Sequence, residues 1–235
     1  MKKHTTIIAF AFLALSSANA DRIAWWNFEP LYWHAPEYDN NQHGPDGYDI
    51  GGVMSGVQSS GLKRGDEATN HKYQRRGESW GGFDFQDISS DDAVESGRYY
   101  YFTLTSELDT IIALTWLEGS LHTSGNGPKF AQWEYSINEA DYEEIGDTPI
   151  DMNTPGEYDG TFRINLAGLF LAEGDSITFR IVAWLGDSDD GTFYFDGRGA
   201  IPELTVFGTV VPEPSTTLLL GVGAAFIAFS RRRRK

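Results

Sequence analysis

The side chains of this sequence best suited to chemistry are aromatic and acidic. Its 235 residues include seven Trp, eleven Tyr and 34 Asp plus Glu. Trp and Tyr rings stack on the apolar faces of sugars, while their polar edges hydrogen-bond to hydroxyl groups. Trp25 and Trp26 are adjacent, and adjacent side chains of a strand point to opposite faces, so one of the pair is expected to be exposed or to lie in a groove. We take Trp26, Trp33 and Trp80 as the candidates for stacking on sugar, and expect at least half of the seven in the core.

The sequence shows no catalytic pattern. A glucanase built on antiparallel strands needs two carboxylates on one strand face, about four residues apart. Glu134 is the single acid of its segment, and the acids of residues 139–144 lie in a stretch typical of a turn. No Gly-x-Ser-x-Gly, His-Glu-x-x-His or P-loop motif occurs, and the absence of Cys excludes thiol catalysis, disulfides and Cys-ligated zinc. His34, His43, His71 and His122 lack metal-ligand spacing. We therefore predict a non-enzyme with no catalytic residues.

The charge balance excludes one class of partner. The formal net charge is −16, from 18 Lys plus Arg and 34 Asp plus Glu. Seven basic residues and one acid belong to residues 1–20 and 212–235, which leaves 11 basic and 33 acidic residues, a net of −22, in between. Binding to nucleic acid draws its affinity from cations that neutralise phosphates. The sequence therefore predicts no nucleic-acid partner.

The region between the two ends favours β-structure. Apolar and aromatic residues alternate with polar ones, at period two, in several short segments separated by Gly, Asp and Asn. These segments are residues 98–106, 110–117, 130–137, 160–166, 176–185, 192–195 and 203–207. Residues 34–97 are expected to form long loops, with weaker strand candidates around Val53 and at 80–85, where Gly81 and Gly82 suggest a loop around Trp80. Residues 166–171 have room for one helical turn. We predict one domain over residues 21–210, an all-β, antiparallel two-sheet sandwich of the jelly-roll type.

Residues 1–20 have the three parts of a secretory signal peptide. Lys2 and Lys3 supply the charge, residues 7–15 are apolar, and Ala18-Asn19-Ala20 is a cleavage site of the A-x-A form. The apolar run is too short for a stable membrane span. We expect a signal helix that is removed, so that the mature protein begins at Asp21.

Residues 211–235 indicate a second membrane signal. A rigid Pro212-Glu213-Pro214 motif precedes the apolar residues 216–229, and the basic cluster Arg231, Arg232, Arg233 and Arg234 follows with Lys235. As a helix the apolar run would be about 21 Å long, against a hydrocarbon core of about 30 Å. Flanking residues, snorkelling arginines and local thinning would make up the difference. Basic residues stay on the cytoplasmic side, so we expect a transmembrane helix with an acidic body outside and the arginines as a membrane stop.

This order of motif, apolar segment and arginines resembles the PEP-CTERM sorting signal of Gram-negative bacteria. The resemblance implies recognition by an exosortase, a membrane transpeptidase that cleaves near the Pro-Glu-Pro motif. It also implies export in a bacterium that makes extracellular polysaccharide. The membrane helix would then be an anchor in the inner membrane before sorting, and the body would end at the cell surface or in the extracellular matrix.

Two short motifs in the body resemble jelly-roll carbohydrate-binding modules. These are Asn27-Phe28-Glu29 near the start and Phe193-Tyr194-Phe195-Asp196 near the end. The resemblance implies a structural calcium ion between the first and last strands, with Glu29 and Asp196 as ligands. A separate acidic run, residues 187–190, favours a solvated hairpin over a calcium loop, because runs of charge are usually solvated.

Three functions remain open on the sequence alone. The first is a non-catalytic surface or matrix protein that binds extracellular polysaccharide through its sandwich. The second is a structural or adhesive matrix component without a discrete ligand site. The third is a glycoside hydrolase, which requires two carboxylates about 5–10 Å apart in a cleft.

Overall fold

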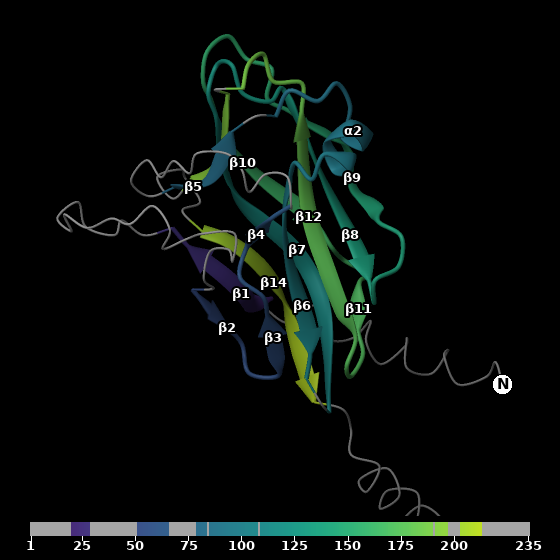
Figure 1. Ribbon diagram of the computed structural model, residues 1–235. Helices are drawn as coiled ribbons and strands as arrows, with labels where there is room; N and C mark the ends of the chain where they lie inside the picture. Colours follow the sequence, from purple (N-terminus) through teal and green to yellow (C-terminus); the bar gives the residue numbers. More distant parts are fainter. Residues whose placement is uncertain are drawn as a thin grey trace, which may run out of the picture.

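The computed structural model describes residues 20–28, 51–65, 79–83, 85–107, 109–189, 191–196 and 203–212. Their regular structure is almost entirely β, in two antiparallel sheets that face each other across the core (Figure 1). The prediction of an all-β two-sheet sandwich is confirmed. The expected signal helix and membrane helix lie outside the described residues. Within the described ranges, no helix is both long and apolar enough to span a membrane.

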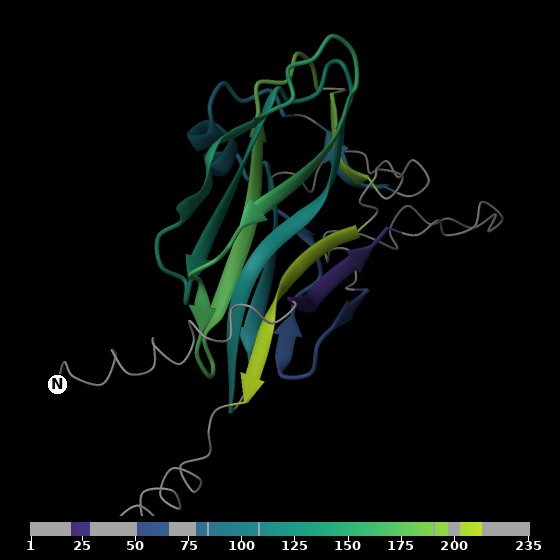
Figure 2. The same ribbon diagram turned by 180° about the vertical axis from the view of Figure 1, so that it is seen from behind.

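Among the described residues, the first sheet has eight strands. They are β1 (Asp21–Asn27), β2 (Gly52–Val53), β5 (Ser79–Phe83), β7 (Thr110–Thr123), β10 (Tyr158–Asn165), β11 (Phe170–Leu171), β13 (Thr192–Asp196) and β14 (Glu203–Pro212). Their order is β2-β1-β14-β7-β13-β5, and β10 and β11 also pair with β7. β7, the longest of the described strands, thus pairs with four others, and Figure 2 shows β14 between β7 and β1.

The second sheet has six strands within the described part of the chain. They are β3 (Val57–Ser59), β4 (Lys63–Arg64), β6 (Tyr99–Ser106), β8 (Phe130–Ile137), β9 (Glu143–Asp151) and β12 (Ser176–Trp184). Their order is β3-β6-β12-β8-β9, with β4 also paired to β6. The short helix α2 (Ser90–Glu95) leads into β6 and contacts β12.

Alternating burial in β6 shows how the sequence builds the core. Tyr100, Phe102 and Leu104 are fully buried, and the residues between them are half-buried on the opposite face, as the period of two predicts. The Tyr100 hydroxyl donates a hydrogen bond to the Phe193 carbonyl oxygen of the facing sheet at 2.9 Å. Burying that hydroxyl is tolerated because it has an acceptor.

Two expectations about local structure are wrong. Glu143 and Glu144 begin β9 rather than lying in a turn, because they pair with Tyr135 and Glu134 of β8. Residues 166–171 hold a turn and then β11, without a helical turn. The helix lies instead at α2, where the Ser89 hydroxyl accepts a hydrogen bond from the Asp92 backbone N–H and so caps the first turn.

Candidate functional site

The side of the eight-stranded sheet that faces away from the core carries an ordered set of polar and aromatic side chains. Strand pairing places Trp25 opposite Thr205, Thr205 opposite Glu118, and Glu118 opposite Arg163. The next row holds Arg22, Phe207, Trp116 and Asn165 in the same strand order. Side chains paired across antiparallel strands share a face, so both rows lie side by side on one surface.

Rings and guanidinium groups in these rows are in contact. The Trp116 and Phe207 rings stack with centroids 4.8 Å apart and planes inclined by 25°. The Arg163 guanidinium carbon lies 5.2 Å from the Trp116 centroid, and that of Arg22 lies 4.5 Å from the Trp25 centroid. We call Arg22, Trp25, Trp116, Arg163 and Phe207 the outer strip.

The outer strip is accessible and held in place. Its three rings are partly exposed and its two arginines are exposed. The Arg163 Nε donates a hydrogen bond to Glu118 Oε2 at 2.7 Å, which fixes the guanidinium beside Trp116. The buried Trp116 Nε1 has no hydrogen-bond acceptor among the described residues. Trp116 therefore offers a ligand its ring face rather than its N–H.

Farther along β7 lies a group that we call the His–Asp cluster, made of His122, Asp159 and Asp196. Tyr194 of β13 pairs with His122, and His122 pairs with Asp159 of β10. Asp196 follows Tyr194 by two residues and shares its face. The His122 Nδ1 lies 2.7 Å from Asp159 Oδ1, and one donor atom from each member lies within 4.8 Å of the others.

The three tryptophans predicted to stack on sugar differ in where the structure places them. Trp26 is fully buried and its ring centroid lies 4.3 Å from that of Phe102, so its selection is wrong: no face of the indole reaches solvent. The partly exposed member of the pair is Trp25. Trp80 lies in β5, opposite Phe195, rather than in a loop, and its side chain is not among those described. Trp33 lies outside the described residues, so its role stays a prediction.

The other predicted site residues are tested only in part. Asp196 is buried at the end of β13, while Glu29 lies outside the described residues, so calcium binding by this pair stays a prediction. Pro212 ends β14. The remaining sorting residues, Glu213, Pro214, Arg231, Arg232, Arg233 and Arg234, lie outside the described residues.

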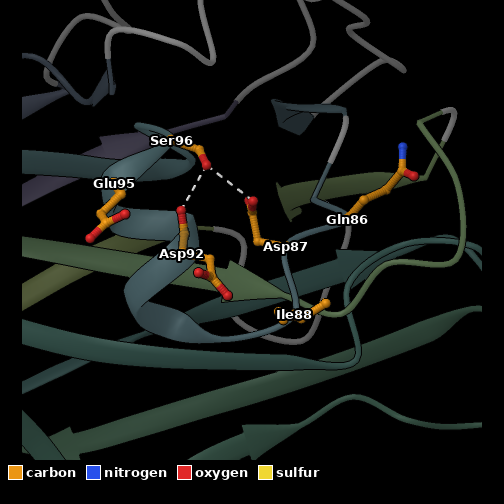
Figure 3. Close-up of a pocket in the computed structure, with 6 residues that line it drawn as sticks. All are labelled: Gln86, Asp87, Ile88, Asp92, Glu95 and Ser96. Carbon is orange, nitrogen blue, oxygen red and sulfur yellow. Dashed lines mark hydrogen bonds between the residues drawn. The ribbon is translucent and has the colours of Figure 1, made fainter.

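Two hollows are less suited to a sugar than the outer strip. One, of about 350 Å³, lies beside α2 and is lined by Gln86, Asp87, Ile88, Asp92, Glu95 and Ser96 (Figure 3). Asp87 binds Arg98 at 2.7 Å and accepts a hydrogen bond from the Ser96 hydroxyl at 3.1 Å, so its carboxylate holds the helix. No aromatic ring of a described residue lines this hollow.

The second hollow, of about 590 Å³, lies between β8, β9 and β10. Its aromatic rings belong to Trp133 and Phe162, which are 1% and 8% exposed. Stacking needs an accessible ring face, and these two rings pack into the core. The outer strip is therefore the better candidate for sugar contact.

Sequence reasoning missed Trp116, Phe207, His122 and Asp159. Trp116 and Phe207 lie at the ends of predicted strands, but their stacking depends on the pairing of β7 with β14, which one sequence does not show. His122 and Asp159 are 37 residues apart in the chain. They meet because β10 pairs with β7, so spacing along the sequence carries no signal of the cluster.

Comparison with known proteins identifies the tail. The PEP-CTERM protein-sorting motif matches residues 210–234. This chain carries a PEP-CTERM sorting signal. The match agrees with the motif, apolar segment and arginines found in the sequence, and it indicates an exported protein that an exosortase processes. No curated protein matches the chain.

Several solved structures resemble the body at low identity. The C-terminal domain of a chitobiase from Bacteroides fragilis is 13% identical, with 67% of this chain and 96% of that chain covered and a TM-score of 0.28. The CBM22-1 xylan-binding domain of Paenibacillus barcinonensis Xyn10C is 9% identical, with 83% and 97% covered and a TM-score of 0.31. CBM32-3 from a family 31 glycoside hydrolase of Clostridium perfringens is 15% identical, with 66% and 92% covered and a TM-score of 0.26. These likenesses transfer no function to this chain.

Proposed function

We propose that this protein is a non-catalytic surface or matrix protein that an exosortase sorts and whose sandwich binds extracellular polysaccharide through the outer strip. The sorting signal supports the destination. The stacked Trp116 and Phe207 rings, beside Trp25 on an accessible sheet face, are the observation that carries the binding function.

The outer strip suits a sugar chain in both shape and chemistry. Its rings lie across β1, β14 and β7 and supply flat apolar surface for the C–H faces of successive sugar rings. Arg22 and Arg163 add hydrogen-bond donors beside the rings. A sugar presents this combination of apolar faces and hydroxyl acceptors.

The charge of the body selects among polysaccharides. A region with a net charge of −22 repels anionic polymers unless cations bridge them. The two arginines of the outer strip are among only 11 basic residues in that region. We therefore expect neutral polysaccharide to bind without added salt, and anionic polysaccharide to need a divalent cation.

The test compares two stacked tryptophans on opposite sides of the molecule. Trp116→Ala removes a ring of the outer strip. Trp184→Ala is the matched control, because Trp184 is also half-buried and also stacks on a Phe, with its ring centroid 5.9 Å from that of Phe130 in the six-stranded sheet. Both variants and the parent are titrated against neutral polysaccharides that the parent binds on a glycan array, with and without calcium.

We expect Trp116→Ala to weaken binding about tenfold, the ~1.4 kcal/mol of one aromatic contact, and Trp184→Ala to change it less than twofold. Equal loss in both variants would place the ligand elsewhere. A parent that binds nothing on the array, with or without calcium, would instead favour a matrix component without a ligand site.

A further inference from the structure

The His–Asp cluster is built from three strands rather than from a flexible loop. β7 supplies His122, β10 supplies Asp159 and β13 supplies Asp196, and the ladders β7–β10 and β7–β13 fix their positions. The imidazole also stacks against the Tyr194 ring, with centroids 6.2 Å apart and planes inclined by 28°. These contacts hold the three donor groups together without a ligand, which lowers the entropy cost of binding one.

The cluster is closed on one side and open on the other. His122 and Asp196 are 7% and 4% exposed, whereas the side chain of Asp159 is 71% exposed. In a tetrahedral zinc site, two donor atoms about 2.1 Å from the ion lie about 3.4 Å apart. The donor atoms of the cluster already lie within 4.8 Å of one another, so they need to close by no more than about 1.4 Å to bind the same ion.

The donor set indicates the kind of metal. Ca²⁺ takes six to eight oxygen ligands, whereas this cluster offers one imidazole nitrogen and two carboxylates. One nitrogen and two carboxylate oxygens suit Zn²⁺ and similar divalent transition metals, which accept four ligands. A divalent ion would also neutralise the two carboxylates.

We propose that His122, Asp159 and Asp196 bind a divalent transition-metal ion of the zinc type, with the fourth position open toward solvent on the Asp159 side. The ion would join β10 and β13 to β7. This site does not depend on the proposed binding of polysaccharide, because it shares no side chain with the outer strip.

The test uses the full-length protein in detergent after treatment with a chelator and dialysis. Zn²⁺ and Ca²⁺ are titrated separately by calorimetry, and Co²⁺ is added as a spectroscopic probe of the imidazole ligand. Asp159→Asn is the main variant, because its side chain is exposed and the fold does not depend on burying it. His122→Gln is the second variant. Asp187→Asn is the control, since Asp187 is similarly exposed at 64% and pairs with Lys129 away from the cluster.

We expect one Zn²⁺ per chain, with Ca²⁺ binding at least 10-fold more weakly. Asp159→Asn and His122→Gln should each lower the zinc affinity at least ~10-fold, since losing even an indirect partner of a metal costs that much. Asp187→Asn and Trp116→Ala should bind zinc like the parent. The proposal is overturned if the parent binds no stoichiometric zinc, if Ca²⁺ binds more tightly, or if Asp159→Asn binds zinc unchanged.

Discussion

Glu134, the acid that stands alone on its segment, belongs to an ion pair on the outward face of the six-stranded sheet. Arg180 Nε donates a hydrogen bond to its Oε2 at 2.6 Å, and both side chains are nearly buried. The Arg180 guanidinium carbon also lies 3.6 Å from the centroid of the Tyr142 ring. Burial raises the pKa of Tyr142, and the nearby Arg180 charge partly opposes that rise. The arrangement gives Glu134 a role in packing.

Removing Glu134 should therefore destabilise the fold. Glu134→Ala leaves the guanidinium of Arg180 without its carboxylate in a nearly buried position, which costs about 3 kcal/mol of unfolding free energy. Glu118→Ala is the control, because its partner Arg163 is 64% exposed and such pairs contribute less than about 1 kcal/mol. Urea unfolding at pH 7 measures both. Equal losses for the two variants would contradict the packing role.

The Trp25–Trp26 pair shows how far sequence reasoning reaches at single residues. Alternation correctly predicts that only one of the two enters the core. It does not identify which one, because the register of β1 against β14 shifts between Arg22 and Ala24. A bulge adds one residue and exchanges the two faces of a strand beyond it. Ile23 and Ala24 are consequently both buried, and Trp26 follows into the core.

At the scale of elements, strands with strong alternation were predictable and irregular ones were not. The segments 98–106, 130–137 and 176–185 correspond closely to β6, β8 and β12. The acidic start of β9 carries no apolar alternation, so pairing with β8 decides its conformation. The two-sheet architecture follows from the periodicity, but the rows of the outer strip depend on pairings between distant strands.

The glycines of β5 show a second limit to predicting structure from the sequence. Gly81 and Gly82 suggest a loop, yet Gly81 pairs with Tyr194. A Cβ atom on Gly81 would collide with the Phe193 carbonyl oxygen and the Tyr194 ring. The missing side chain therefore permits a close approach of β5 to β13, a use of glycine that its sequence neighbours do not reveal.

Gly81→Ala should consequently disturb the pairing of β5 with β13. The overpacked strand should lose about 1–3 kcal/mol of unfolding free energy. Gly125→Ala is the matched control, because a Cβ atom there would make only ordinary contacts, the nearest at 3.5 Å from the Gly156 carbonyl oxygen. Thermal unfolding compares the two variants. A Gly81→Ala protein as stable as Gly125→Ala would show that β5 contributes little to the sheet.

At the scale of the whole molecule, the signal peptide and the sorting signal each predict one cut. We expect the surface form to begin at Asp21 and to end near the Pro212-Glu213-Pro214 motif. Intact-mass spectrometry of the surface fraction reads both ends and any group added at the second. Replacing Pro212, Glu213 and Pro214 by Ala should leave the tail uncut and the protein in the inner membrane. A variant that reaches the surface as readily as the parent would contradict exosortase processing.

The last described strand has a mechanical consequence. β14 pairs with β1 on one side and with β7 on the other, and its ladder to β7 continues to Pro212, where the sorting motif begins. If the body were tethered to the cell through this end, the drag of flowing liquid would pull directly on β14. Because the load runs along the strand, both rows of hydrogen bonds would resist it in shear, sharing the force instead of opening one by one.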